Sequence, residues 1–110
     1  MSHWIDICHR NDVVAGTGVC ALVNSEQVAI FRCRTTDSLY AVSNYDPIGQ
    51  ANVLSRGIMG SIEGQVVVAS PLYKQHFCLN TGSCLQSPEH QLKTYQVRYA
   101  GEKIQLLSAA

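Results

Sequence analysis

Turn-forming residues interrupt this chain at short intervals, so it has room for strands but not for long helices. The clearest strand signal covers residues 93–100, where Tyr95, Val97 and Tyr99 alternate with polar residues. Such alternation places apolar side chains on one face of a strand and polar side chains on the other. A turn at Ala100-Gly101 and a second alternating stretch follow, which together predict a C-terminal hairpin.

Further strands are predicted upstream, where short apolar segments flank polar or glycine-containing turns. Asn24-Ser25-Glu26 separates two such segments, and Glu63-Gly64 separates another two, since glycine permits a positive φ in a two-residue turn. The run 66–69 is typical of a strand buried on both faces, and short helices are predicted at 11–15 and 52–55. The expected fold class is therefore all-β and antiparallel. The predicted upstream strands are 19–23, 27–34, 39–42, 58–62 and 66–69.

Size and charge exclude several classes of protein. A chain of 110 residues builds one core, so residues 1–110 are expected to form a single domain. Eight basic and eight acidic residues are scattered and give no net charge, which argues against a nucleic-acid partner. No apolar run approaches the length of a membrane span, and residues 1–6 lack the features of a secretory signal. The expected location is the cytoplasm, where the five irregularly spaced cysteines would be free thiols.

The segment 70–82 carries the most specific motif. It reads Ser-Pro-Leu-Tyr-Lys-Gln-His-Phe-Cys-Leu-Asn-Thr-Gly, and it resembles the Rieske pattern C-P-x-H-x-x-x-F-x-x-x-T-G. Upstream, Asp46-Pro47-Ile48 stands where Rieske proteins have C-x-H. The resemblance implies a Rieske-like antiparallel β-sandwich or barrel, in which residues from about 43 to 85 form a loop-rich subdomain of the cluster-binding type.

In Rieske proteins, two cysteine thiolates and two histidine nitrogens from two loops hold a [2Fe–2S] cluster. The resemblance assigns these ligand positions to Asp46, Ile48, Ser70 and Tyr73. Three of them offer only oxygen and Ile48 offers no donor atom, whereas soft sulfur ligation is what retains an iron–sulfur cluster. We therefore expect an empty site, with no metal or cofactor bound by this chain. Asp46 and Tyr73 either form a hydrogen bond across this site or each face solvent, and the sequence leaves both arrangements open.

The resemblance is closest to the small subunits of bacterial NAD(P)H-dependent nitrite reductases. In that family the large subunit carries FAD, a [4Fe–4S] cluster and sirohaem, takes electrons from NADH or NADPH, and reduces nitrite to ammonium. The resemblance therefore implies a small, non-catalytic subunit that docks to the large subunit and supports or tunes it. The segments that carry it are Trp4, 18–22, 40–44, 46–47, 53–57 and 70–72.

The resemblance also suggests a docking surface, because the tip formed by the two cluster-binding loops meets redox partners in Rieske proteins. Apolar and aromatic side chains beside a lysine have the composition expected at the centre of an interface. The candidate partner-binding residues are Pro47, Ile48, Gly49, Leu72, Tyr73 and Lys74. If the aliphatic members instead fill the volume of the cluster, their truncation would weaken folding and not binding.

Two other functions stay open on the sequence alone. One is a Rieske-type electron-transfer ferredoxin. The other is a small thiol- or metal-dependent protein using His76 and Cys78, which would share one face of a strand because they are two residues apart. Adding Cys84 and His90 gives the residue types of a zinc site, but the spacing does not match the common zinc motifs.

Two weaker motifs have a structural explanation. Cys8 and His9 are adjacent, so on a strand they would point to opposite faces and could not form a nucleophile–base pair. Gly16-Thr17-Gly18 resembles part of a phosphate-binding loop, but a strand and not a helix is predicted to follow, which indicates a tight turn.

Overall fold

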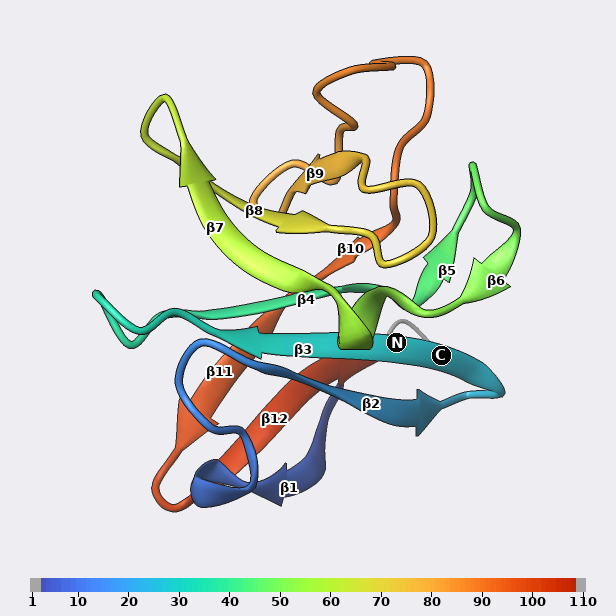
Figure 1. Cartoon of the computed structure of the whole chain (residues 1–110). Helices are drawn as coiled ribbons and strands as arrows, with labels where there is room; N and C mark the ends of the chain where they lie inside the picture. The colour runs from blue at the N-terminus through green and yellow to red at the C-terminus, as the bar shows by residue number, and fades with distance from the viewer. Residues whose placement is uncertain (1–2, 109–110) are drawn as a thin grey trace.

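Strand β3 (Glu26–Arg32) lies at the centre of the fold because four successive side chains in it are completely buried on alternate faces. In the computed structural model, which describes residues 3–108, Val28 and Ile30 contribute to one hydrophobic cluster. Ala29 and Phe31 contribute to a second cluster on the opposite face. The sheet that contains β3 therefore separates two cores (Figure 1).

The first core lies between two antiparallel sheets, one of three strands and one of four. The three-stranded sheet has the order β1-β12-β11, and the four-stranded sheet has the order β10-β4-β3-β2 (Figure 1). Side chains from both sheets meet in this cluster, including Val28, Ile30, Ile104 and Leu106. The new strands are β1 (His3–His9), β12 (Lys103–Ser108), β11 (Val97–Ala100), β10 (Thr94–Tyr95), β4 (Leu39–Ser43) and β2 (Gly18–Val23).

The second core lies between β3 and a smaller layer built by the segment between β4 and β10. This layer contains a three-stranded sheet of order β7-β8-β9 and a two-stranded hairpin of β5 and β6. Phe31 and Val42 from the central sheet pack with Val68 and Phe77 of the smaller sheet. The strands are β5 (Tyr45–Asp46), β6 (Ala51–Asn52), β7 (Ile58–Ile62), β8 (Gln65–Ala69) and β9 (His76–Cys78).

The structure confirms the all-β antiparallel prediction and the three hairpins. The turn between β2 and β3 is a two-residue loop in which Asn24 and Ser25 both have positive φ. Glu63 and Gly64 adopt the same left-handed conformation between β7 and β8, as expected for a two-residue hairpin. Gly16 also has a positive φ, and the hydroxyl of the next residue caps the turn there, which agrees with the tight-turn interpretation.

Three local expectations need correction. The strand predicted at 93–100 is divided at Gln96 into β10 and β11, because its two halves pair with strands of different sheets. Val66 is only half-buried, so the apolar run is buried on both faces at Val67 and Val68 alone. The helices predicted at 11–15 and 52–55 are single 3-10 turns, η1 (Arg10–Asp12) and η2 (Leu54–Arg56), which overlap the predicted ranges only in part. No helix within residues 3–108 is long and apolar enough to cross a membrane.

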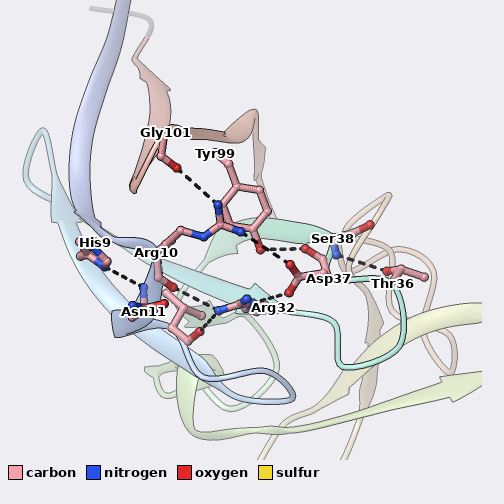
Figure 2. Close-up of polar contacts among 10 residues, drawn as sticks. His9, Arg10, Asn11, Arg32, Thr36, Asp37, Ser38, Tyr99 and Gly101 are labelled. Atoms are coloured by element: carbon pink, nitrogen blue, oxygen red, sulfur yellow. Dashed lines mark hydrogen bonds and ion pairs between the residues drawn. The ribbon is translucent and has the colours of Figure 1, made fainter.

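A polar network ties together three loops at one end of the first core (Figure 2). Arg32 donates from Nε to the Asp37 carboxylate at 2.5 Å and from Nη1 to the carbonyl of Val13 at 3.1 Å. The Tyr99 hydroxyl donates to the Asp37 carbonyl at 2.8 Å, and the Arg10 guanidinium lies 4.5 Å from the Tyr99 ring centroid. These contacts connect η1, the β3–β4 turn and the C-terminal hairpin.

This network predicts an acid-sensitive part of the stability. The hydrogen bond from Arg32 lowers the pKa of Asp37 from its ordinary value, although partial burial opposes the shift. A carboxylate whose pKa is lower in the folded chain than in the unfolded chain stabilises the folded state. This contribution is fully present above the unfolded-state pKa, about 4, and is lost as pH falls through the folded-state pKa. In urea unfolding, we expect the difference in stability between wild type and Asp37→Asn to shrink as pH falls from about 5 to about 2. The exposed control Glu89→Gln should show no such convergence, and a difference independent of pH would contradict the prediction.

Candidate functional site

The first of the two Rieske-like loops is closed by the side chain of Asp46, at the end of β5. Oδ1 of this carboxylate accepts hydrogen bonds from the amides of Ile48 at 2.8 Å and Gly49 at 3.0 Å. The carbonyl of Asp46 accepts a further bond from the Gln50 amide at 2.7 Å. An aspartate that accepts from amides two and three residues ahead fixes a tight turn locally, which explains why this residue type suits the position.

The buried side chain of Asn44 holds the entry to this loop in place. Its Nδ2 donates to Gln27 Oε1 at 3.0 Å, and its Oδ1 accepts from the Ser55 amide at 2.7 Å. The Leu54 amide donates to the Asn44 carbonyl at 3.1 Å. One amide side chain thus joins β3, the start of the first loop and η2.

The second loop connects β8 to β9 and is closed around Ser70. The Ser70 amide donates to the Gln75 carbonyl, and the Lys74 amide donates to the Ser70 carbonyl, both at 2.9 Å. Lys74 has a positive φ of 58°, which lets the chain reverse direction before β9. The Ser70 hydroxyl oxygen also accepts a weak bond from the Leu72 amide at 3.3 Å.

A buried hydrogen bond joins the two loops. The Ser70 hydroxyl donates to Asp46 Oδ2 at 2.5 Å, and both residues are almost completely buried. Both oxygens of the carboxylate are therefore satisfied, one by its own loop and one by the other loop. The loops are also tightly packed beside this bond, because a Cβ on Gly49 would lie only 2.3 Å from a methyl of Leu72.

The four positions that the Rieske resemblance assigned to cluster ligands differ in their contacts and in their exposure to solvent. Asp46 and Ser70, at the two cysteine positions, are in direct contact. Ile48 packs against the second hydrophobic cluster, whereas Tyr73 is 67% exposed. The structure therefore answers the question left open between Asp46 and Tyr73, since the partner of Asp46 across the loops is Ser70. The short, mutually complementary side chains at the two cysteine positions were a signal for this pair that the sequence analysis did not use.

The donor chemistry of these residues does not fit a Rieske cluster. The Asp46 carboxylate and the Ser70 hydroxyl are hard oxygen groups engaged with each other, and Ile48 presents only hydrocarbon. Iron–sulfur clusters are held by thiolates, with imidazoles replacing two of them in Rieske centres. Tyr73 points its side chain to solvent and adds no soft ligand.

The candidate docking residues are divided between exposed and half-buried positions. Leu72 is 44% exposed, and Tyr73 and Lys74 are also exposed. Pro47, Ile48 and Gly49 are half-buried, and the hydrocarbon of Ile48 packs against the core cluster, which favours the alternative that Ile48 supports the fold. Tyr45, which the sequence analysis missed, is 44% exposed directly before Asp46.

The structure places His76 and Cys78 on β9, as expected, but does not bring them together as a nucleophile–base pair. His76 Nδ1 lies 2.9 Å from Gln86 Nε2, and no hydrogen bond within residues 3–108 joins it to Cys78. Burial acts to raise the pKa of Cys78, but hydrogen bonds from Thr81 and Asn80 outweigh it and the pKa is lowered. No three His, Cys, Asp or Glu side chains in the described part of the chain are arranged to hold a metal ion.

The remaining cysteines are free, and the pKa values of two of them, Cys8 and Cys33, are shifted in opposite directions. Burial and the nearby charge of Asp12 raise the pKa of Cys8, so this thiol is not activated by His9 beside it. Hydrogen bonds from the Thr36 side chain and from the Thr36 and Thr35 amides lower the pKa of the buried Cys33 to about 7. Sequence analysis could not identify Cys33, because its acidity depends on the turn that follows it.

Comparison with known proteins agrees with this architecture. The model of the Rieske-like [2Fe-2S] domain family matches residues 3–107. The small subunit of the NADH nitrite reductase of Salmonella typhimurium is 46% identical over 106 residues, which cover 96% of this chain and 98% of that protein. The chain belongs to the Rieske-like nitrite reductase small subunits.

Two further relatives of this nitrite reductase small subunit bear on its structure and its partner. The NMR structure of the Escherichia coli protein NirD is 44% identical and superposes with a TM-score of 0.91, with both chains completely covered. A segment of the large subunit of nitrite reductase [NAD(P)H] from Klebsiella oxytoca is 35% identical over 101 residues. That match covers 92% of this chain and 10% of the Klebsiella protein.

The bond between the loops predicts a specific stability effect. Ser70→Ala removes the donor to Asp46 Oδ2 and leaves a buried carboxylate oxygen unsatisfied, so we expect a loss of about 2 kcal/mol in the free energy of unfolding. Ser61→Ala, at an exposed serine of β7, is the matched control and should change stability by less than about 0.5 kcal/mol. Equal effects of the two substitutions in urea unfolding would show that the bond contributes nothing.

Proposed function

We propose that this chain is a small, non-catalytic subunit of a cytoplasmic NAD(P)H-dependent nitrite reductase, and that it holds no [2Fe–2S] cluster. The observation that carries the proposal is the buried Asp46–Ser70 hydrogen bond, which joins the two loops where a cluster would otherwise join them. The fold of the family is kept, while the groups at the four positions lack the ligand chemistry of a Rieske centre.

The partner in this proposal is the large subunit, which would carry FAD, a [4Fe–4S] cluster and sirohaem. The Klebsiella oxytoca large subunit supports the pairing, because it contains in one polypeptide a segment similar to almost the whole of this chain. When a domain is a separate chain in one protein and part of a longer chain in another, we expect the separate domain to act in contact with the rest of that longer chain. In this division of work the large subunit oxidises the nicotinamide and reduces nitrite to ammonium, and the small subunit supports or tunes it.

The surface proposed to dock is the exposed part of the loop tip, made by Leu72, Tyr73 and Lys74. Leu72 is 44% exposed and Tyr73 is 67% exposed, and neighbouring apolar or aromatic side chains on a surface are typical of an interaction site. Tyrosine is enriched at the energetic centres of interfaces because it buries a large area and still offers a hydroxyl. This surface is supported by three half-buried residues, Pro47, Ile48 and Gly49, of which Ile48 packs against the core cluster.

The direct test is reconstitution. The two subunits should co-purify, and nitrite-dependent oxidation of NADH or NADPH should be measured for the large subunit with and without this chain. Failure to co-purify under any ionic strength would contradict the proposed partnership.

The iron content separates this proposal from the alternative of an electron-transfer ferredoxin. The purified chain should be colourless, should contain no iron, and should unfold at the same temperature with and without EDTA. In metal-dependent small domains the binding energy is part of the folding energy, so chelation would lower the melting temperature. Visible absorption with stoichiometric iron would establish the ferredoxin alternative instead.

Truncations at the tip should separate binding from folding. Tyr73→Ala removes an exposed side chain, so we expect an unchanged melting temperature and a loss of about 2 kcal/mol in affinity for the large subunit. Ile48→Ala should instead lower the free energy of unfolding by about 1–2 kcal/mol, because it opens space beside the core cluster. Val14→Ala, at a side chain 63% exposed before β2, is the control and should alter neither quantity. Wild-type affinity in Tyr73→Ala would refute docking through this tip.

A further inference from the structure

The two sheets around the first core have β1 and β2 as edge strands, and these two strands follow each other along the chain (Figure 1). In the described part of the chain, β1 pairs with β12 alone and β2 pairs with β3 alone. A groove of about 530 Å³ is lined by Ile5–Cys8 on one side and by residues 19–24 on the other. Unlike a closed barrel, this part of the molecule therefore presents two strand edges to the same space.

The pairing of β2 with β3 determines which backbone groups of β2 lie at its unpaired edge. The two-residue turn makes Val23 and Glu26 the closing pair, and Val19 and Ala21 then also exchange hydrogen bonds with β3. The N–H and C=O groups of the residues in between, Gly18, Cys20 and Leu22, point away from β3. Within residues 3–108, no other backbone group bonds to these three.

Strand β2 lacks the features that usually protect an exposed edge. Its sequence, Gly-Val-Cys-Ala-Leu-Val, contains no charged residue and no proline, and none of its residues forms a bulge against β3. Cys20 is exposed, and Leu22 is 73% exposed. An uncharged, regular edge with outward apolar side chains is suited to pairing with an added strand.

The charge of the groove restricts what kind of strand fits. Among residues 3–108, the charged residues that line it are Asp6 and Asp12. Each carboxylate is hydrogen-bonded through one oxygen, Asp6 to Gln105 and Asp12 to the His9 amide. A complementary strand would therefore carry Lys or Arg next to apolar residues. A second copy of this chain fits poorly, because neither β1 nor β2 contains Lys or Arg.

We propose that an extended segment of the large subunit pairs with the free edge of β2 in this groove. The segment has alternating apolar residues, which cover Leu22, and at least one Lys or Arg that reaches Asp6 or Asp12. The inference deepens the proposed function, on which it rests, and it adds a contact separate from the loop tip. No residue of the tip lines the groove.

Amide hydrogen exchange in the complete two-subunit complex tests the proposal. In the isolated small subunit, the amides of Gly18, Cys20 and Leu22 should exchange rapidly, whereas those of Val19 and Ala21 should be protected by β3. In the complex, exchange at Gly18, Cys20 and Leu22 should slow by about tenfold or more. Formation of the complex is checked independently by its mass.

Variants at Leu22 separate the backbone contact from the side-chain contact. Leu22→Pro removes an N–H that bonds nothing in the isolated chain, and Leu22→Ala keeps that N–H and removes the side chain. We expect about tenfold weaker binding for Leu22→Pro than for Leu22→Ala. The exchange measurement on wild type decides the matter if the proline variant does not fold.

Each contrary outcome has a distinct meaning. A complex of the correct mass with unchanged exchange at the three amides would overturn the groove proposal and leave the proposed function intact. Protection that appears in the isolated subunit together with a doubled mass would assign the edge to a second copy and also overturn it. Absence of any complex would overturn the proposed function and this inference with it.

Discussion

The burial of β3 on both faces is the constraint on which the rest of the structure depends. Val28 and Ile30 point into the core between the two larger sheets, while Ala29 and Phe31 point into the core beneath the loops. A polar side chain at any of these positions would be buried without a hydrogen-bonding partner. Because both faces of the strand are buried, no shift in its register would expose one face to solvent. The loops that define the candidate site are thereby supported on one side of a sheet whose other side is fully packed. Val42 of β4 continues this support toward the loops.

The hydrogen bond between Asp46 and Ser70 joins two loops that are joined by a metal cluster in Rieske proteins. A cluster holds its loops with four strong bonds, whereas a single buried hydrogen bond to a charged group contributes only about 1.5–3 kcal/mol. The remaining stability comes from packing, since Ile48 joins the core cluster and Leu72 lies against Gly49. Loops held in this way are fixed by shape complementarity, which explains why position 49, against Leu72, is a glycine.

Much of the fold follows from local rules that act along the sequence. The alternation at Tyr95, Val97 and Tyr99 is confirmed, since all three pack against the first core. The division of that stretch at Gln96 was not predictable, because it depends on which strand each half meets in space. The pairing of Asp46 with Ser70 was missed for the same reason: the residues are 24 positions apart, and either could have bonded to water. The packing of Ile48 against the core was not predictable either, because the spacing of residues in the sequence does not determine whether a loop side chain packs inward or faces solvent.

The antiparallel pairing of β1 with β12 places His3 opposite Ser108, so both ends of the described chain lie side by side on neighbouring strands of the same sheet (Figure 1). A module with adjacent ends can be joined to a longer polypeptide without breaking a strand or crossing its own surface. Covalent attachment then replaces a bimolecular encounter with a tethered one, in which the effective concentration is set by the linker and not by expression level. The Klebsiella oxytoca protein, in which a similar segment is part of a much longer chain, is compatible with this geometry. A genetic fusion of the two polypeptides at either end would therefore preserve every strand pairing in the module.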